Sequence, residues 1–266
     1  ASGLIPNEGF SLCYSRQDVV DPKGTESGAF TLGGSDERVR KTPQVWTGGT
    51  GSGGFYSVKL RKMYLREGNS GPSAKSTNPD AKVIPINISS LKGQVIVDSG
   101  TTDTYFSRAI SSQFSSAFQQ LSGKKYGHGK QKLSLDEVEA MPTILIQLIG
   151  DENLNKELGD GVPGLSGEVD PDNPYDVLLA IPATHYMEFD ADEDAWVNRF
   201  YADEPSGGVI GGNAMMGHDV FFDVDNHRLG WAEADCDYTK LLKDNGIDIK
   251  PQPPKPSGQP PTTPAP

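Results

Sequence analysis

Residues 95–102 have the sequence Val95-Ile96-Val97-Asp98-Ser99-Gly100-Thr101-Thr102, and this stretch decides how the chain is interpreted. Three apolar residues predict a buried strand that stops at a carboxylate, followed by a hydroxyl, a glycine and two more hydroxyls. A carboxylate at the end of a buried strand is costly unless it is hydrogen-bonded. Glycine allows a sharp turn that brings backbone N–H groups to the acid, and the hydroxyls can donate to it. The residues alone leave two interpretations open, a catalytic aspartate or an Asp-capped turn before a helix.

The regions around this octapeptide predict many short strands and few helices. The 31 glycines and 20 prolines interrupt the chain too often for long helices. Apolar residues recur at helical spacing over 107–121, where Ser107 can cap the helix, and a short helical turn is predicted over 133–140. We therefore expect a mainly β fold, antiparallel, with short helices. Further strands are predicted at 10–14, 29–32, 55–60, 143–149, 208–211, 220–224 and 228–232.

Polar stretches predict the connections and the domain limits. Residues 67–82 are expected to form an exposed loop and residues 151–176 an acidic insertion loop. A second acidic cluster at 188–204 is interpreted, like the insertion, as solvated surface. Residues 250–266 hold 8 of the 20 prolines and cannot bury a core. We expect one domain over 1–238 and a flexible Pro-rich tail over 239–266.

The composition excludes several classes of function. A formal net charge of −12 repels phosphate backbones and anionic lipid, so we expect no nucleic-acid partner. No apolar run approaches the roughly 18–20 residues that span a bilayer. The first residues have neither the basic nor the apolar region of a signal peptide, and there is no initiating Met. We expect a processed or truncated product.

Several partial motifs fail on their context. Residues 49–54 fit G-x-G-x-x-G, but a strand-like run follows where a dinucleotide site needs a helix. Residues 223–226 open like a calcium loop, yet Arg228 and Ala234 stand where such a loop needs Gly and Glu. The four histidines show no metal-ligand spacing, and no G-x-S-x-G nucleophile motif occurs. We expect no cofactor and no metal.

The octapeptide resembles the second active-site motif of pepsin-like aspartic peptidases, in which apolar residues precede D-[ST]-G-[ST]. Other segments resemble that family in its order along the chain, over about residues 10–236. They are Phe10-Ser11-Leu12, the hairpin 28–36, Trp46 with Phe55-Tyr56-Ser57-Val58, Met141-Pro142-Thr143-Ile144, 181–186, Val209-Ile210-Gly211-Gly212-Asn213 and 221–232. The resemblance implies one lobe of the usual two, the C-terminal lobe of a pepsin-like acid protease.

The same resemblance implies an aspartic-type endopeptidase that hydrolyses peptide bonds of a polypeptide substrate with two carboxylates and an activated water. Asp98 corresponds to the second catalytic aspartate. Ser99 and Thr101 correspond to its hydrogen-bonding supports, and Gly100 and Thr102 to residues lining the substrate cleft. No second D-[ST]-G occurs in the chain. The first aspartate is therefore expected on an N-terminal lobe that the chain lacks, and the chain alone is expected to be nearly inactive.

The two cysteines, Cys13 and Cys236, allow either two buried thiols or one disulfide. Their positions resemble those that the beta-secretase type links, which implies a disulfide. Asn87 begins the only N-x-[ST] sequon and is the predicted glycosylation site. Together these features favour the secretory pathway, meaning an extracellular, vacuolar or lysosomal, or luminal location. The Pro-rich tail would suit a stalk before a membrane anchor beyond the chain.

Two alternatives stay open. A catalytically silent pepsin homologue would act as a protein-binding module, and loss of the first aspartate from the parent protein would favour it. Two copies could also pair, each donating Asp98, although this lobe is large and its insertions obstruct such pairing.

Overall fold

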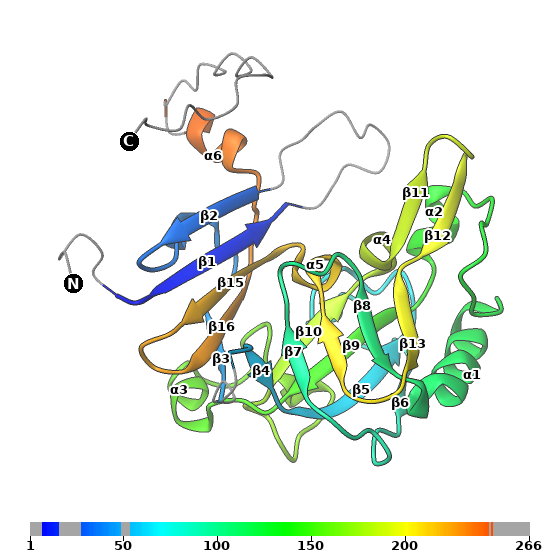
Figure 1. The fold of residues 1–266 in the computed structure, drawn as a ribbon, viewed down its shortest axis with the longest axis horizontal. Helices are drawn as coiled ribbons and strands as arrows, with labels where there is room; N and C mark the ends of the chain where they lie inside the picture. The colour runs from blue at the N-terminus through cyan, green and yellow to red at the C-terminus, as the bar shows by residue number, and fades with distance from the viewer. Residues whose placement is uncertain (1–6, 16–27, 49–53, 245, 247–266) are drawn as a thin grey trace, which may run out of the picture.

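A computed structural model describes residues 7–15, 28–48, 54–244 and 246. Short strands dominate it, as predicted, and they form three larger sheets and one hairpin within the described residues. Most pairings are antiparallel, but two are parallel, and both lie in the sheet that carries Asp98. Figure 1 shows this sheet and the one behind it forming the body of the molecule, with the sheet of β1 and β2 extending to one side.

The first sheet joins the two ends of the described chain. Its order is β2-β1-β15-β16-β3. The strands are β1 (Gly9–Tyr14), β2 (Gly28–Leu32), β15 (His218–Asp223), β16 (Arg228–Glu233) and β3 (Val45–Thr47). β1 pairs with β15 in register from Gly9↔Asp223 to Cys13↔Asp219. An early strand therefore lies between its neighbour in sequence, β2, and a strand from the end of the domain.

The second sheet supplies the most buried strands, in the order β10-β9-β5-β6. They are β10 (Val177–Ile181), β9 (Thr143–Leu148), β5 (Leu60–Arg66) and β6 (Val83–Ile86). Every residue of β9 and β10 is buried, which is why their sequences are mostly apolar rather than alternating, with the buried Gln147 as an exception in β9. This sheet contributes buried residues to two hydrophobic clusters, the larger of which also includes residues of the other two sheets and of α1.

The third sheet has the order β13-β8-β14-β7-β4. Its strands are β13 (Phe200–Glu204), β8 (Thr104–Ser107), β14 (Gly208–Ile210), β7 (Val95–Val97) and β4 (Ser57–Val58). The predicted strands at 95–97 and 208–211 are thus confirmed, and they are direct neighbours. The predicted strand at 55–60 is instead divided between β4 and β5.

The two predicted helices are present. Ser107 caps a 3₁₀ turn (Arg108–Ile110) that leads into α1 (Ser111–Ser122), which ends at Gly123 with a positive φ of 70°. The turn at 133–140 is α2 (Leu135–Glu139), where Ser134 and Glu137 form a reciprocal capping box. A further short helix, α4 (Ala183–Tyr186), leads into the hairpin β11 (Met187–Asp190) and β12 (Ala195–Asn198).

The acidic insertion differs from the expectation of a solvated loop. It contains α3 (Glu152–Glu157) and a 3₁₀ turn (Ser166–Glu168), and two of its acids, Asp170 and Asp176, are buried. Both accept hydrogen bonds of 2.8 Å from the buried Gln147 amide. Burial opposes the charge of Asp170, but bonds from Gln147, Lys62 and Asn173 outweigh it and lower the pKa of this carboxyl. Two acidic residues of this insertion therefore form part of the buried structure through their hydrogen bonds to Gln147.

The described residues continue past the expected domain boundary at 238/239. A short helix, α6 (Tyr238–Asp244), crosses the expected boundary at 238/239, and Tyr238 and Leu241 pack against the cluster around the two cysteines. Residues 245 and 247–266, which contain most of the predicted tail, lie outside the described part of the chain, as do residues 49–53 of the rejected glycine motif.

Candidate active site

Asp98 lies directly after β7, where β7 and its neighbour β14 in the third sheet end. Its backbone N–H donates to the carbonyl oxygen of Ile210 (3.1 Å), which continues the parallel pairing of Val97 with Ile210. Two segments that resemble the peptidase family in sequence, 95–102 and 209–213, are therefore neighbours in the fold. The chain then turns at Ser99 and Gly100, which are both exposed, while Asp98 itself is half-buried.

The two carboxylate oxygens of Asp98 have separate donors. The backbone N–H of Gly100 donates to Oδ1 (2.9 Å), and the hydroxyl of Thr101 donates to Oδ2 (2.6 Å). Both contacts were expected from the sequence. They fix the carboxylate orientation relative to the turn, because each oxygen is bound by a group within three residues. Thr102 is exposed beside them.

The turn is supported from behind by the segment after β14. The backbone N–H groups of Gly212 and Asn213 donate to the carbonyl oxygens of Thr101 (2.7 Å) and Thr102 (2.9 Å). A Cβ atom at Gly211 would lie 2.1 Å from the carbonyl oxygen of Asp103, so only glycine allows this approach. The close approach explains Gly211, the first of the two glycines that follow Val209-Ile210 in the sequence.

Sequence reasoning missed a second set of supports. The buried Thr104 hydroxyl donates to Oδ1 of Asn213 (2.6 Å) and accepts from the N–H of Gly211 (3.3 Å). The Asn213 amide also donates to the carbonyl of Arg199 (3.1 Å). These residues join the ends of β8, β13 and β14, and no local pattern identifies them because Thr104 lies more than 100 residues before Gly211 and Asn213.

Tyr14 is the other residue that the sequence did not identify. It ends β1, and its side chain hydrogen-bonds to Ser99. Burial raises the pKa of the Tyr14 phenol; the hydrogen bond to Ser99 opposes that effect, and the nearby negative charge of Asp98 adds to it. The first sheet therefore contacts the Asp98 turn directly.

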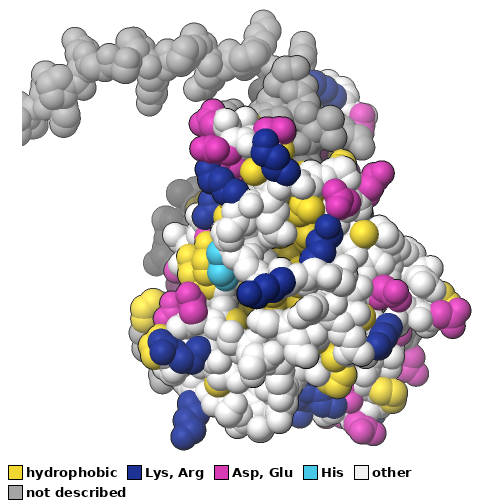
Figure 2. Space-filling model, turned by 90° about the vertical axis from the view of Figure 1, so that its right-hand side faces the viewer, with side chains coloured by type: hydrophobic (Ala, Val, Ile, Leu, Met, Phe, Trp, Pro, Cys, Tyr) yellow, Lys and Arg dark blue, Asp and Glu magenta, His cyan; other side chains and the backbone are white. Residues whose placement is uncertain are grey.

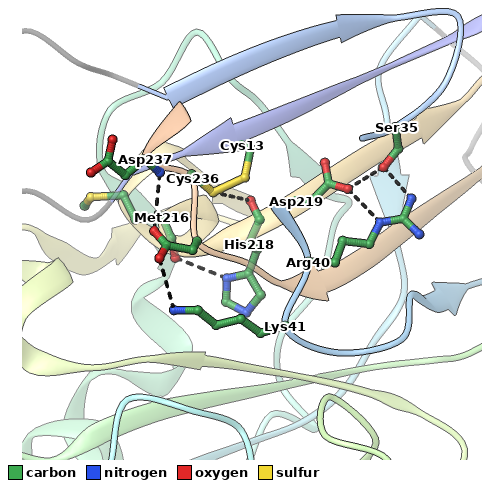
Figure 3. Close-up of a disulfide and its surroundings, with 10 residues drawn as sticks. Cys13, Ser35, Arg40, Lys41, Met216, His218, Asp219, Cys236 and Asp237 are labelled. Carbon is green, nitrogen blue, oxygen red and sulfur yellow. Dashed lines mark hydrogen bonds and ion pairs between the residues drawn. A yellow bond between two sulfur atoms is a disulfide. The ribbon is translucent and has the colours of Figure 1, made fainter. Parts of the chain in front are cut away.

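The predicted disulfide between Cys13 and Cys236 is present, with a Cα–Cα distance of 5.2 Å. Both residues are 2% exposed. Figure 3 shows it beside a buried ionic group in which Asp219 accepts from Arg40 (3.0 Å) and from the Ser35 hydroxyl. The disulfide therefore ties β1, and with it Tyr14, to the segment that follows β16.

The remaining predicted sites stand apart from Asp98. Asn87 is exposed, and its side-chain oxygen accepts from the N–H of Ser89 (2.8 Å). A cavity of about 430 Å³ is lined by some of the residues in 69–77, 139–143 and 182–184, and not by residues 98–102.

Within the described residues, no group of three or more His, Cys, Asp or Glu side chains could hold a metal ion. No helix in the same part of the chain is long and apolar enough to cross a membrane.

No protein-family model matches the sequence, and no curated protein sequence matches it either.

Proposed function

We propose that this chain is the C-terminal lobe of a pepsin-like aspartic endopeptidase, and that Asp98 is one of its two catalytic carboxylates. The observation that supports this most is the Asp98 turn. Asp98 lies at the end of β7, and its two carboxylate oxygens accept hydrogen bonds from Gly100 and Thr101. The neighbouring strand β14 and the glycine turn after it lie directly behind Asp98. A half-buried carboxylate whose orientation is fixed in this way can act as an acid or a base toward a bound substrate.

In this function the pair of aspartates shares one proton. Two carboxylates within hydrogen-bonding distance cannot both ionise readily, so one acts as base toward a water molecule while the protonated one polarises the peptide carbonyl. Ser99, whose side chain bonds Tyr14, and Thr101 hold the geometry, and the exposed Gly100 and Thr102 line the substrate path.

Exposed apolar side chains on the sheet whose Tyr14 contacts the Asp98 turn support the need for a second lobe. On β2, Phe30 and Leu32 are 63% and 60% exposed, and they pair across the sheet with Leu12 and Phe10 of β1. The same face of β1 ends at Tyr14. Side chains of this size seldom lie exposed together on a monomer, so they indicate an interface. We propose that the lobe carrying the first aspartate covers this face.

The test is cleavage of a mixed peptide library between about pH 3 and 6, with the chain alone and joined to the N-terminal lobe of its parent protein. The chain alone is expected to be nearly inactive, because a single carboxylate cannot activate water and donate to the carbonyl at once. The two-lobe protein is expected to cleave peptides in a pepstatin-sensitive manner. Asp98→Asn should abolish turnover, while Asp80→Asn, the same change at an exposed loop site, should leave it unchanged.

The other outcomes decide between the alternatives. Absence of cleavage by a folded two-lobe protein would favour a silent homologue that binds proteins. Pepstatin-sensitive cleavage by the chain alone, only at concentrations where it dimerises, would favour self-pairing. The disulfide is compatible with the proposed secretory location.

A further inference from the structure

The cavity of about 430 Å³ lies where three segments of the chain meet. Its walls come from the loop after β5 (within 69–77), from the end of α2 and the start of β9 (within 139–143), and from the start of α4 (within 182–184). Cavities that bind small groups commonly have volumes in this range. None of residues 98–102 lines it, so what it binds does not depend on the proposed function of Asp98.

Hydrogen bonds hold the walls of the cavity in place. The Arg66 side chain is 1% exposed, and it donates at 2.7–3.0 Å to three carbonyl oxygens of the loop, those of Gly71, Ser73 and Ala74. The backbone N–H of Asn69 donates to the carbonyl oxygen of Glu139 (3.1 Å), which joins the loop to α2. The Tyr186 hydroxyl donates to the carbonyl oxygen of Pro142 (2.6 Å), which joins α4 to the residues before β9. The cavity is therefore built on fixed elements, as a binding site requires.

Polar side chains without partners line the cavity. Five of them form no side-chain hydrogen bond with any described residue, and they are Asn69, Thr77, Glu139, Thr143 and Thr184. Thr143 is only 4% exposed, so the cavity is the space from which its hydroxyl can gain a partner. A buried hydroxyl that lacks a hydrogen bond costs free energy, and a polar ligand in the cavity would remove that cost.

The charge of the cavity comes from Glu139. Among the described residues that line it, Glu139 alone is ionisable; it is exposed and forms no ion pair with the rest of the described chain. α1 and α2 lie on the right-hand side of Figure 1, which is the side that Figure 2 shows, and there acidic and basic side chains are scattered rather than gathered by sign. The charge that a ligand meets in the cavity is therefore that of Glu139. The net charge of −12 attracts cations to the chain as a whole.

We propose that this cavity binds the side chain of a lysine that belongs to a polypeptide. An ammonium group has three donors that radiate from one nitrogen, and it can bond the carboxylate together with hydroxyls. The three hydroxyls come from three different walls, since Thr77 lies in the loop, Thr143 in β9 and Thr184 in α4. Acceptors spread in this way suit a compact ammonium better than the planar fork of a guanidinium.

The rest of the lining fits the remainder of a lysine residue. Pro72, Pro182 and Ala183 supply apolar surface for the four-carbon stem. The cavity volume also leaves room for peptide backbone beside the side chain. The site thus gives the lobe a contact with a basic polypeptide that is separate from Asp98.

The first test measures binding to the chain alone and needs no catalysis. Capped Gly-Gly-Lys-Gly-Gly peptide is titrated into the isotopically labelled chain and followed by NMR of the threonine methyl groups. The comparisons are the same peptide with acetyl-lysine, the same peptide with arginine, and n-butylamine, which has the stem and the charge without a peptide. We expect the lysine peptide to shift the resonances of Thr77, Thr143 and Thr184 and to bind at least three-fold more tightly than each comparison.

Each contrary result overturns the proposal. Equal binding of the acetyl-lysine peptide would remove the role of charge, and equal binding of the arginine peptide would remove the choice of an ammonium. Equal binding of n-butylamine would show that no polypeptide is needed. No binding of the lysine peptide, or shifts confined to other surfaces, would show that the cavity is not its site.

Variants test the carboxylate and a hydroxyl separately. Glu139→Gln should weaken binding about three- to five-fold, the effect of one exposed ion pair. Glu157→Gln is the matched control, because Glu157 is also the exposed last residue of a short helix, α3, and it should leave binding unchanged. Thr184→Val keeps the shape of the side chain without the hydroxyl and should weaken binding about two-fold or more. The amide spectrum of each variant verifies its fold. Unchanged binding by Glu139→Gln with an intact spectrum would refute the site, whatever Asp98 does.

Discussion

Removal of the Cys13–Cys236 disulfide should be among the most destabilising changes in this chain. The bridge closes a loop with a sequence separation of 223 residues. The loss of loop entropy in the unfolded chain grows with the logarithm of loop length, which gives roughly 5 kcal/mol here. Since whole domains are stable by only about 5–15 kcal/mol, this is a large fraction of the total. Cys13→Ala/Cys236→Ala is the suitable variant, because both sites are buried and a serine would add an unsatisfied hydroxyl.

Equilibrium urea unfolding provides the assay. With a slope of about 3 kcal/mol per molar urea, the midpoint should fall by roughly 1.5–2 M. Cys13→Ala alone, which also lacks the bridge, should resemble the double variant, and so should the reduced wild-type chain. A double variant within about 1 kcal/mol of the wild type would refute the reasoning, because it would mean that the unfolded chain gains little freedom when the bridge is removed.

Three further outcomes follow from the fold. Asp170→Asn should lower the free energy of unfolding by about 2 kcal/mol at pH 7, because the folded-state pKa of this buried carboxyl is lowered. The difference in stability between variant and wild type should shrink as the pH falls below about 4. A difference in thermal melts that stays constant down to pH 2 would contradict this. Gly211→Ala should cost at least about 1–3 kcal/mol in urea unfolding, since its Cβ would clash with the backbone of Asp103, whereas Gly127→Ala, with open space around it, should be nearly neutral; equal effects would be inconsistent with the clash. Expression through a eukaryotic secretory pathway should place a glycan on the exposed Asn87, and a glycosidase-sensitive mass that persists in Asn87→Gln would show another site.

Local features of the site could be predicted from the sequence, because their partners are neighbours in the chain. The Asp98 turn is one such feature: Gly100 and Thr101 lie two and three residues from the acid that they bond. The cap at Ser107 and the short helix within 133–140 are others. The pairing of Cys13 with Cys236 is long-range, and it was predictable only through a resemblance to a known family.

The features that were missed depend on tertiary contacts. Nothing near Tyr14 in the sequence indicates its bond to Ser99, since the two residues meet only when the first and third sheets pack together. The burial of Asp170 was missed for a similar reason. An acidic segment usually is solvated, and the Gln147 amide that accommodates this carboxyl lies on a different element.

The insertion of β14 between β7 and β8 has a consequence for the order of events during synthesis. The strand that ends at Asp98 is complete more than 100 residues before its partner at Gly208–Ile210 leaves the ribosome. The delay is longer still for β1, because its partner β15 begins only at His218. Pairings of such long range form slowly, and unpaired strand edges are prone to aggregation until they form. The nascent chain should therefore depend on chaperones through most of its translation, and the Asp98 turn should be among the last parts of the domain to become ordered.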